Sequence, residues 1–296
     1  MDTEAALLRY RDADSWPAED AMAAMLENQF GAFAAVRLAL PALAAAATAA
    51  ADRLRGGQGR LIYAGAGASG RLAVQDGVEL HPTFGWPPAR LAYLVAGGDA
   101  ALVRSAEGAE DDADAGTRGM AALGPRPQDV VVAVAASGAT RYTCAVQAAA
   151  VAAGSMTVAL ANNPGAPLLQ AAGHPILLHT GPEFLAGSTR MTAGTAQKIA
   201  LNLLSTRIMS DLGRVHRGLM VDMAPSNAKL VARAHRMVAA IASVPLSEAA
   251  AAWDAAGGNV RVAALMLRGM ARPDAEAALH AAGGRLDRAL DVAGRD

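Results

Sequence analysis

The chain has very little cysteine, few aromatic residues and almost no net charge. Its single cysteine, Cys144, excludes an intramolecular disulfide and favours a reducing compartment. Aromatic residues make up 4% of the 296 positions, and the formal net charge is −1. A chain with this balance has no general attraction for nucleic acid or an anionic membrane. Any site for an anion must therefore work through local geometry.

Motifs for metals and nucleotide cofactors are also missing. The six histidines show no HxxH or HExxH spacing, and no cluster of cysteines or carboxylates accompanies them. The segment GAGASG has its glycines at the wrong intervals for a dinucleotide fingerprint, and no GK[ST] suits a nucleoside triphosphate. We therefore expect neither a metal nor a cofactor, and we interpret Cys144 as a small buried hydrophobe on a helix.

The sequence contains no evident export or membrane segment. The first residues, MDTEAALLRYRDAD, lack the basic and apolar regions of a signal peptide. The apolar stretch 38–51 is short and contains Pro41, which predicts that it does not span a bilayer as one helix. We expect a soluble, cytoplasmic protein.

Two strand-to-helix turns of one design are the most informative feature that is present. They are GRLIYAGAGASGRL (59–72) and DVVVAVAASGATRY (129–142), each an apolar run that opens into Gly, Ser and a small residue. A helix begun in this way aims free backbone N–H groups and its positive dipole end at the turn, which favours an anion. The hydroxyls of Ser69, Ser137 and Thr140 add donors. Together the turns predict a site for a sugar phosphate or another small organic phosphate.

The apolar runs alternate with helical patterns along the middle of the chain. Continuous runs of strand length occupy 60–65, 91–97, 129–136, 156–162 and 174–180. Such runs are typical of strands covered on both faces, and the alternation predicts an α/β fold with a parallel sheet. Ligands of such sheets bind at the carboxyl ends of the strands, where both turns lie.

Helical patterns flank this central region. Residues 17–55 are expected to be helical with a break near Pro41, and 188–213 and 225–242 to form further helices. The tail contains two copies of a helix, a Gly-Gly turn and a second helix, which predict a small bundle. We divide the chain into an N-terminal helical segment (1–56), a phosphate-binding domain (57–243) and a C-terminal bundle (244–296).

Several motifs resemble those of a known family, in order and in spacing. The segments GGQGRLIYAGAGASGRL, ELHPTFGWPP, AEGAEDDADAG, DVVVAVAASGAT, GPEFLAGSTRMTAGTAQKIALNLLS and LMVDMAPSNAKL resemble the N-acetylmuramic acid 6-phosphate etherases. This family belongs to the sugar isomerase (SIS) superfamily, as does the glucokinase regulatory protein. The resemblance covers about residues 57–290. It implies a three-layer α/β/α sandwich with a five-stranded parallel sheet, N-terminal helices and a small ubiquitin-associated-like C-terminal bundle.

The resemblance also implies an activity and a set of site residues. The family cleaves the D-lactyl ether of N-acetylmuramic acid 6-phosphate to N-acetylglucosamine 6-phosphate and D-lactate in cell-wall recycling, without a metal, as a cytoplasmic homodimer with its site near the interface. Its two catalytic glutamates match Glu79 in VELHP and Glu110 in EGAED. The expected substrate-binding residues are Gly67, Ala68, Ser69, Gly70, Ser137, Gly138, Thr140 and Ser188.

Several positions depart from the pattern usual in the family, and these changes leave the exact substrate open. They are Ala68, Val78, Leu80, His81, Ala139, Arg141 and Thr192.

Two carboxyl groups suit this chemistry. One must be ionised to take the proton from C2, and the other must be protonated to donate to the leaving lactate oxygen. Which glutamate plays which part is left open. Glu79 follows Ser69 by ten residues, so an unbroken helix would separate the two by about 15 Å. Either the helix ends early near Gly77, or Glu79 serves the site of a neighbouring subunit; we favour the second alternative.

Two other functions use the same phosphate turns. One is a non-catalytic sugar-phosphate sensor that controls a partner through the helical tail, and the other is an aldose–ketose isomerase. The presence of both Glu79 and Glu110 favours the lyase over the sensor.

Overall fold

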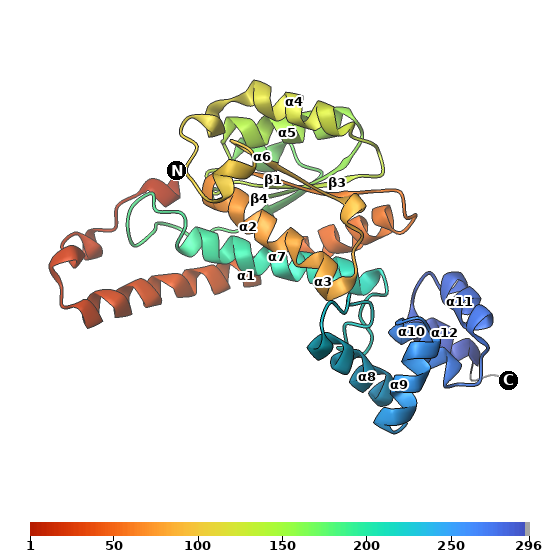
Figure 1. Cartoon of the computed structure of the whole chain (residues 1–296). Coiled ribbons are helices and arrows are strands. Elements are labelled where there is room, and N and C mark those ends of the chain that lie inside the picture. The colour runs from red at the N-terminus through yellow and green to blue at the C-terminus, as the bar shows by residue number, and fades with distance from the viewer. Residues whose placement is uncertain (294–296) are drawn as a thin grey trace. The chain divides into compact units, whose positions relative to one another are not determined.

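The computed structural model describes residues 1–293 and contains two compact units (Figure 1). The first unit comprises Met1–Gly77 and Ala89–Ser205, and the second comprises Val78–Pro88 and the chain from Thr206 onward. The first unit holds the sheet and the second is helical. The division at residues 56 and 243 stays a prediction.

The sheet of the first unit has five parallel strands in the order β2-β1-β3-β4-β5. Every residue of β1, β3 and β4 is buried, as the continuous apolar runs predicted. The α/β fold with a five-stranded parallel sheet is therefore confirmed. The strands are β1 (Leu61–Gly65), β2 (Leu91–Val95), β3 (Val130–Val134), β4 (Met156–Ala161) and β5 (His174–Leu177).

Helices cover both faces of this sheet (Figure 1). On one face, Met120, Tyr142 and Val146 pack against Ile62 and Val131. On the other face lie α1, α2 and the part of α7 that belongs to this unit. The helices are α1 (Ala18–Leu54), α2 (Gly67–Val78), α4 (Ala113–Leu123), α5 (Arg141–Ala152), α6 (Pro167–Gln170) and α7 (Thr192–Asp211).

The predicted break at Pro41 is wrong, because α1 runs without interruption through it. Pro41 lacks the N–H that would donate to the carbonyl of Arg37, and both residues are exposed, so water can replace the missing bond. The helix is held by the opposite face of its second half, where Ala39, Leu43 and Ala46 are buried. Burial along this stripe outweighs the local cost of the proline.

The length of α1 also corrects the expectation that its apolar stretch is too short to span a membrane. By length and composition alone, this 37-residue helix passes as a possible span, with a mean hydropathy of 1.7 in its most apolar window. The core helix of a soluble protein passes the same test, and 39% of that window is buried inside the protein.

The second unit is built from short helices around its own core. Val238, Val262, Leu265 and Leu279 lie in this core. Both predicted hairpins are present, as α9–α10 and α11–α12, with glycines of positive φ in their turns. The helices are α3 (Leu80–Phe84), α8 (Ala228–Ala242), α9 (Leu246–Ala255), α10 (Val260–Met266), α11 (Arg272–Ala281) and α12 (Leu286–Ala293).

Candidate active site

The two predicted turns lie side by side at one edge of the sheet. Gly65 at the end of β1 is paired in register with Val134 at the end of β3, so the chain leaves both strands at the same level. The first helical bonds of α2 and α5 are donated by Gly70 and Cys144. The N–H groups before them have no acceptor within their helices, and they point toward the turns.

A cavity of about 440 Å³, here called the main cavity, opens at these turns. Its lining includes Ser69, which is only 8% exposed, and the hydroxyl-bearing pair Ser137 and Thr140. The Oγ of Ser137 accepts from the N–H of Ala139 at 3.1 Å and lies 3.4 Å from the Oγ1 of Thr140. Of the predicted residues, those that line the main cavity are Gly67, Ala68, Ser69, Ser137, Thr140 and Glu110.

Gly70 and Gly138 are not among the residues that line the main cavity in the described part of the chain. They permit close packing behind it. A Cβ on Gly70 would stand 2.9 Å from the carbonyl carbon of Gly65, so the glycine lets α2 start against β1. Gly138 has a φ of +65°, and a Cβ there would meet the side chain of Ala166 at 2.4 Å. These glycines bring the helix starts into place without touching the space that a ligand would occupy.

Glu110 lies in a short 3₁₀ helix, Ala109–Asp111, beside the main cavity. It also lines a second cavity of about 300 Å³, here called the side cavity, which shares Ala66 and Gly67 with the first. Arg71, one residue beyond the serine turn, lines the side cavity. Glu110 therefore stands at the junction of the two spaces.

The loop between β5 and α7 contributes a wall of the main cavity. Glu183 is fully buried, and its two carboxylate oxygens accept from the N–H groups of Thr192 and Ala193, each at 2.8 Å. This cap fixes the start of α7 and the loop before it. Ser188, predicted as a substrate-binding residue, is not among the lining residues, although its neighbours Gly187 and Thr189 are.

The first residues of the chain form another wall, which the sequence patterns did not reveal. Thr3 is 1% exposed; its N–H donates to Oδ1 of Asn163, and its Oγ1 accepts from Nδ2 of the same residue. Its carbonyl accepts from the N–H of Gly187 at 2.9 Å. This anchoring places Met1 and Glu4 on the lining of the main cavity. No periodicity marks such a segment, since its contacts come from residues about 160 and 184 positions away in the chain.

Glu79 is placed differently from the other predicted residues. The lining of the main cavity comes from the first unit, whereas Glu79 belongs to the second, at the start of α3, and is exposed. Helix α2 is continuous over Gly67–Val78, so Val78 lies about 14 Å along the axis from Ser69. Nothing within α2 shortens that separation.

Two other ionisable groups of the first unit do not belong to the cavity lining. Burial raises the pKa of Cys144, so its thiol stays protonated near neutral pH. Burial, together with the neighbouring Asp76, raises the pKa of Tyr63 well above its usual value, and the Tyr63 hydroxyl donates to Asp76 at 2.7 Å. Within residues 1–293, no group of three or more His, Cys, Asp or Glu side chains is placed to hold a metal ion.

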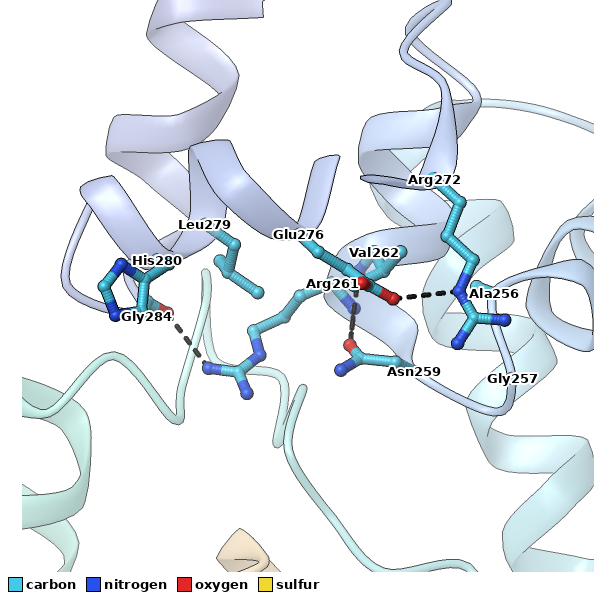
Figure 2. Close-up of a pocket in the computed structure, with 10 residues that line it drawn as sticks. All are labelled: Ala256, Gly257, Asn259, Arg261, Val262, Arg272, Glu276, Leu279, His280 and Gly284. Atoms are coloured by element: carbon cyan, nitrogen blue, oxygen red, sulfur yellow. Dashed lines mark hydrogen bonds and ion pairs between the residues drawn. The ribbon is translucent and has the colours of Figure 1, made fainter. Parts of the chain in front are cut away.

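The second unit has a cavity of its own, of about 430 Å³, between the helical hairpins (Figure 2). Its charged side chains already have partners: Arg272 donates to Glu276 at 2.8 Å, and Arg261 donates to the carbonyl of Gly284 and pairs with Asp222. Its lining contains neither a pair of serine turns nor a carboxylate without a hydrogen-bond partner. The main cavity is therefore the stronger candidate for a reaction site.

Known proteins resemble this chain over most of its length. Residues 43–156 match the model of the glucokinase regulatory protein N-terminal SIS domain. The N-acetylmuramic acid 6-phosphate etherase of Deinococcus radiodurans is 49% identical over 95% of this chain and 92% of its own length. The etherase of Rubrobacter xylanophilus is 47% identical over 86% of this chain and 84% of its own.

A phosphoheptose isomerase from Francisella tularensis shares the fold. It aligns with 66% of this chain and 100% of its own, with a TM-score of 0.51 and 20% identity. The chain belongs to the family of N-acetylmuramic acid 6-phosphate etherases.

Proposed function

We propose that this protein is a lyase that cleaves the D-lactyl ether of N-acetylmuramic acid 6-phosphate, giving N-acetylglucosamine 6-phosphate and D-lactate. The observation that carries the proposal is the convergence of both Ser/Gly turns and Glu110 on one cavity, in a chain of the etherase family. The turns suit the phosphate, because helix N-termini and hydroxyls donate hydrogen bonds to its oxygens.

The chemistry is an elimination followed by hydration of the open-chain sugar. A carboxylate takes the proton from C2, which the adjacent aldehyde acidifies, and a double bond forms between C2 and C3 as the C3–O bond breaks. A second carboxyl group donates its proton to the departing lactate oxygen. Water then adds, with its hydroxyl going to C3 and a proton to C2. The two steps together change no oxidation state overall and need no cofactor.

Glu110 and Glu79 are the two carboxyl groups in this proposal. Glu110 already lines the main cavity, and its side chain has no hydrogen-bond partner within residues 1–293, so it is available to a substrate. In this proposal, Glu79 of one subunit contributes to the active site of the other subunit. The hydroxyls of Ser69, Ser137 and Thr140 donate to the phosphate in this proposal, beside Gly67 and Ala68 on the same lining. Gly70 and Gly138 act indirectly, because they hold the two helix starts in place. Ser188, in the loop before α7, is also proposed to bind the substrate, although only its neighbours Gly187 and Thr189 line the cavity.

A homodimer is part of the proposal, and the exposed face of α1 supports it. Met22, Leu26, Phe30, Phe33 and Leu40 are between 46% and 67% exposed and recur at helical spacing along one side of α1. Large apolar side chains gathered in this way mark an interaction surface, since water contact with them is unfavourable. We propose a second copy of this chain as the partner, in the cytoplasm, where amino sugars from the cell wall are recycled.

The test is to incubate the protein with N-acetylmuramic acid 6-phosphate and to follow D-lactate and N-acetylglucosamine 6-phosphate together. Equal amounts of the two products are expected. A sensor would bind the sugar phosphate without turnover, and an isomerase would convert an aldose to a ketose without releasing lactate. Either result would replace the lyase assignment.

A further inference from the structure

Arg71 is a basic side chain that lines the side cavity, which adjoins the main cavity at Ala66, Gly67 and Glu110. It lies in α2, two residues after Ser69, and is half-buried. Among the described residues, it is the only lysine or arginine side chain that lines either the main or the side cavity. Within residues 1–293, the guanidinium of Arg71 has no acidic side chain as a hydrogen-bond partner.

The loop after β2 holds the guanidinium in one orientation. Its Nε donates to the carbonyl of Ala101 at 3.0 Å, and its Nη2 donates to the carbonyl of Arg104 at 3.3 Å. Its Nη1 has no hydrogen-bond partner within the described part of the chain. Because the guanidinium is planar, two bonds to carbonyls fix the direction of the remaining N–H groups. Arg71 is thus held in a fixed orientation, and its Nη1 group remains available to donate hydrogen bonds to a ligand.

The substrate proposed above carries two anions at opposite sides of the bond that breaks: the 6-phosphate and the carboxylate of the lactyl group. The main cavity has the serine turns that suit a phosphate, and the side cavity has the arginine. Glu110 lines both. With the phosphate at the turns, the lactyl group can enter the side cavity while the C3–O bond lies beside Glu110.

We propose that Arg71 binds the lactyl carboxylate in the side cavity and so selects the ether substrate over sugar phosphates that lack this group. The inference rests on the proposed function and adds a specificity residue to it. Guanidinium–carboxylate pairs combine charge with directed hydrogen bonds, which suits recognition of a small acid. The pair would also hold the leaving group in line with its proton donor.

The first experiment compares Arg71→Met with the wild-type protein on two ligands. We expect kcat/KM for N-acetylmuramic acid 6-phosphate to fall about 10- to 100-fold, the scale of a charge-assisted hydrogen bond. The Kd of N-acetylglucosamine 6-phosphate, which has no lactyl group, should change less than about twofold on the same reasoning. Arg118→Met, an exposed arginine on α4, is the matched control and should leave both values unchanged.

The second experiment replaces the lactyl carboxylate by its neutral amide in the substrate. The wild-type protein should prefer the acid over the amide, and Arg71→Met should lose most of this preference. Arg71→Lys, which retains the charge, should keep part of it. The ratio between the two substrates is insensitive to a general loss of folded protein, so it remains interpretable if the variant is less stable.

Three outcomes would overturn the inference while leaving the lyase assignment intact. They are an Arg71→Met variant with unchanged kcat/KM on the acid, equal losses on acid and amide, or an equal loss in N-acetylglucosamine 6-phosphate binding. The last two would mean that Arg71 serves only to hold the loop at Ala101 and Arg104. A wild-type protein that binds N-acetylglucosamine 6-phosphate but releases no lactate would instead overturn the proposed function.

Discussion

Single hydroxyl groups should account for a measurable part of phosphate binding. Ser137→Ala removes a hydroxyl from the lining of the main cavity, and we expect the binding of a sugar phosphate to weaken by about 1–2 kcal/mol. Calorimetry with N-acetylglucosamine 6-phosphate measures this. Ser15→Ala, an exposed serine in the N-terminal segment, is the control. Unchanged affinity in both Ser69→Ala and Ser137→Ala would contradict the phosphate assignment.

The glutamates should affect turnover rather than phosphate binding. Glu110→Gln and Glu79→Gln keep the shape of each side chain but remove its acid–base function, so lactate release should fall about 100-fold or more. The Kd of inorganic phosphate should change little. Glu19→Gln, in the first turn of α1, controls for loss of a surface carboxylate. Wild-type turnover in either active-site variant would remove that residue from the mechanism.

Asp129 should make stability depend on pH. It is fully buried immediately before β3 and accepts from the backbone and side chain of Arg60, with the closest contact at 2.6 Å. Burial pushes the pKa of this carboxyl upward, but the bonds from Arg60 and from the N–H of Arg126 outweigh it, so the net pKa is lowered. A group with a lowered folded-state pKa stabilises the protein above its unfolded pKa of about 4, and this stabilisation is lost as the pH falls through the folded value.

Asp129→Asn should therefore lower the free energy of unfolding by about 3 kcal/mol at pH 7, since it leaves Arg60 without its buried partner. The difference from wild type should shrink below pH 4. Urea denaturation at several pH values measures both effects. A difference that is the same at pH 3 and at pH 7 would show that the charge of Asp129 is unimportant.

At the scale of elements, β1 and the start of α2 approach each other closely in the first phosphate turn. Gly70→Ala would place a Cβ 2.9 Å from the carbonyl carbon of Gly65, so α2 must move away. We expect a loss of about 1–3 kcal/mol in the free energy of unfolding, together with weaker sugar-phosphate binding, because the helix N-terminus shifts. Thermal denaturation and calorimetry measure the two effects.

Gly31 provides a matched glycine for this test. It also lies in a helix, but a Cβ there would have its nearest neighbours at 3.5 Å, an ordinary contact. Gly31→Ala should be neutral or slightly stabilising, as alanine favours a helix over glycine. Equal effects of the two substitutions would argue that the contact with Gly65 has no special role.

At the scale of the whole molecule, subunit mixing tests which subunit supplies Glu79. If the site is shared across a dimer, mixing inactive Glu79→Gln with inactive Ser137→Ala subunits should restore part of the activity, because some heterodimers contain one intact site. Random exchange would return up to about one quarter of the wild-type sites. No recovery after proven subunit exchange would mean that each chain builds its complete site alone.

The strands and the serine turns could be predicted from the sequence, whereas the other walls of the main cavity could not. The runs around Val131 and Val158 predicted buried strands, because continuous apolar runs of this short length are typical of strands covered on both faces. Ser69 and Ser137 could be placed near each other because both follow strands of one parallel sheet. By contrast, the anchoring of Thr3 on Asn163 joins residues 160 positions apart, and no local pattern signals it.

Local preferences follow from the amino-acid sequence alone: which runs form buried strands, where helices begin, and which residues can face an anion. These depend on neighbouring residues only. The tertiary structure decided that α1 continues through Pro41, because a buried stripe on the sheet offsets one lost hydrogen bond. It likewise decided that Gly70 packs behind the main cavity and that Arg71 lines the side cavity together with Glu110, because both depend on how closely α2 approaches its neighbours.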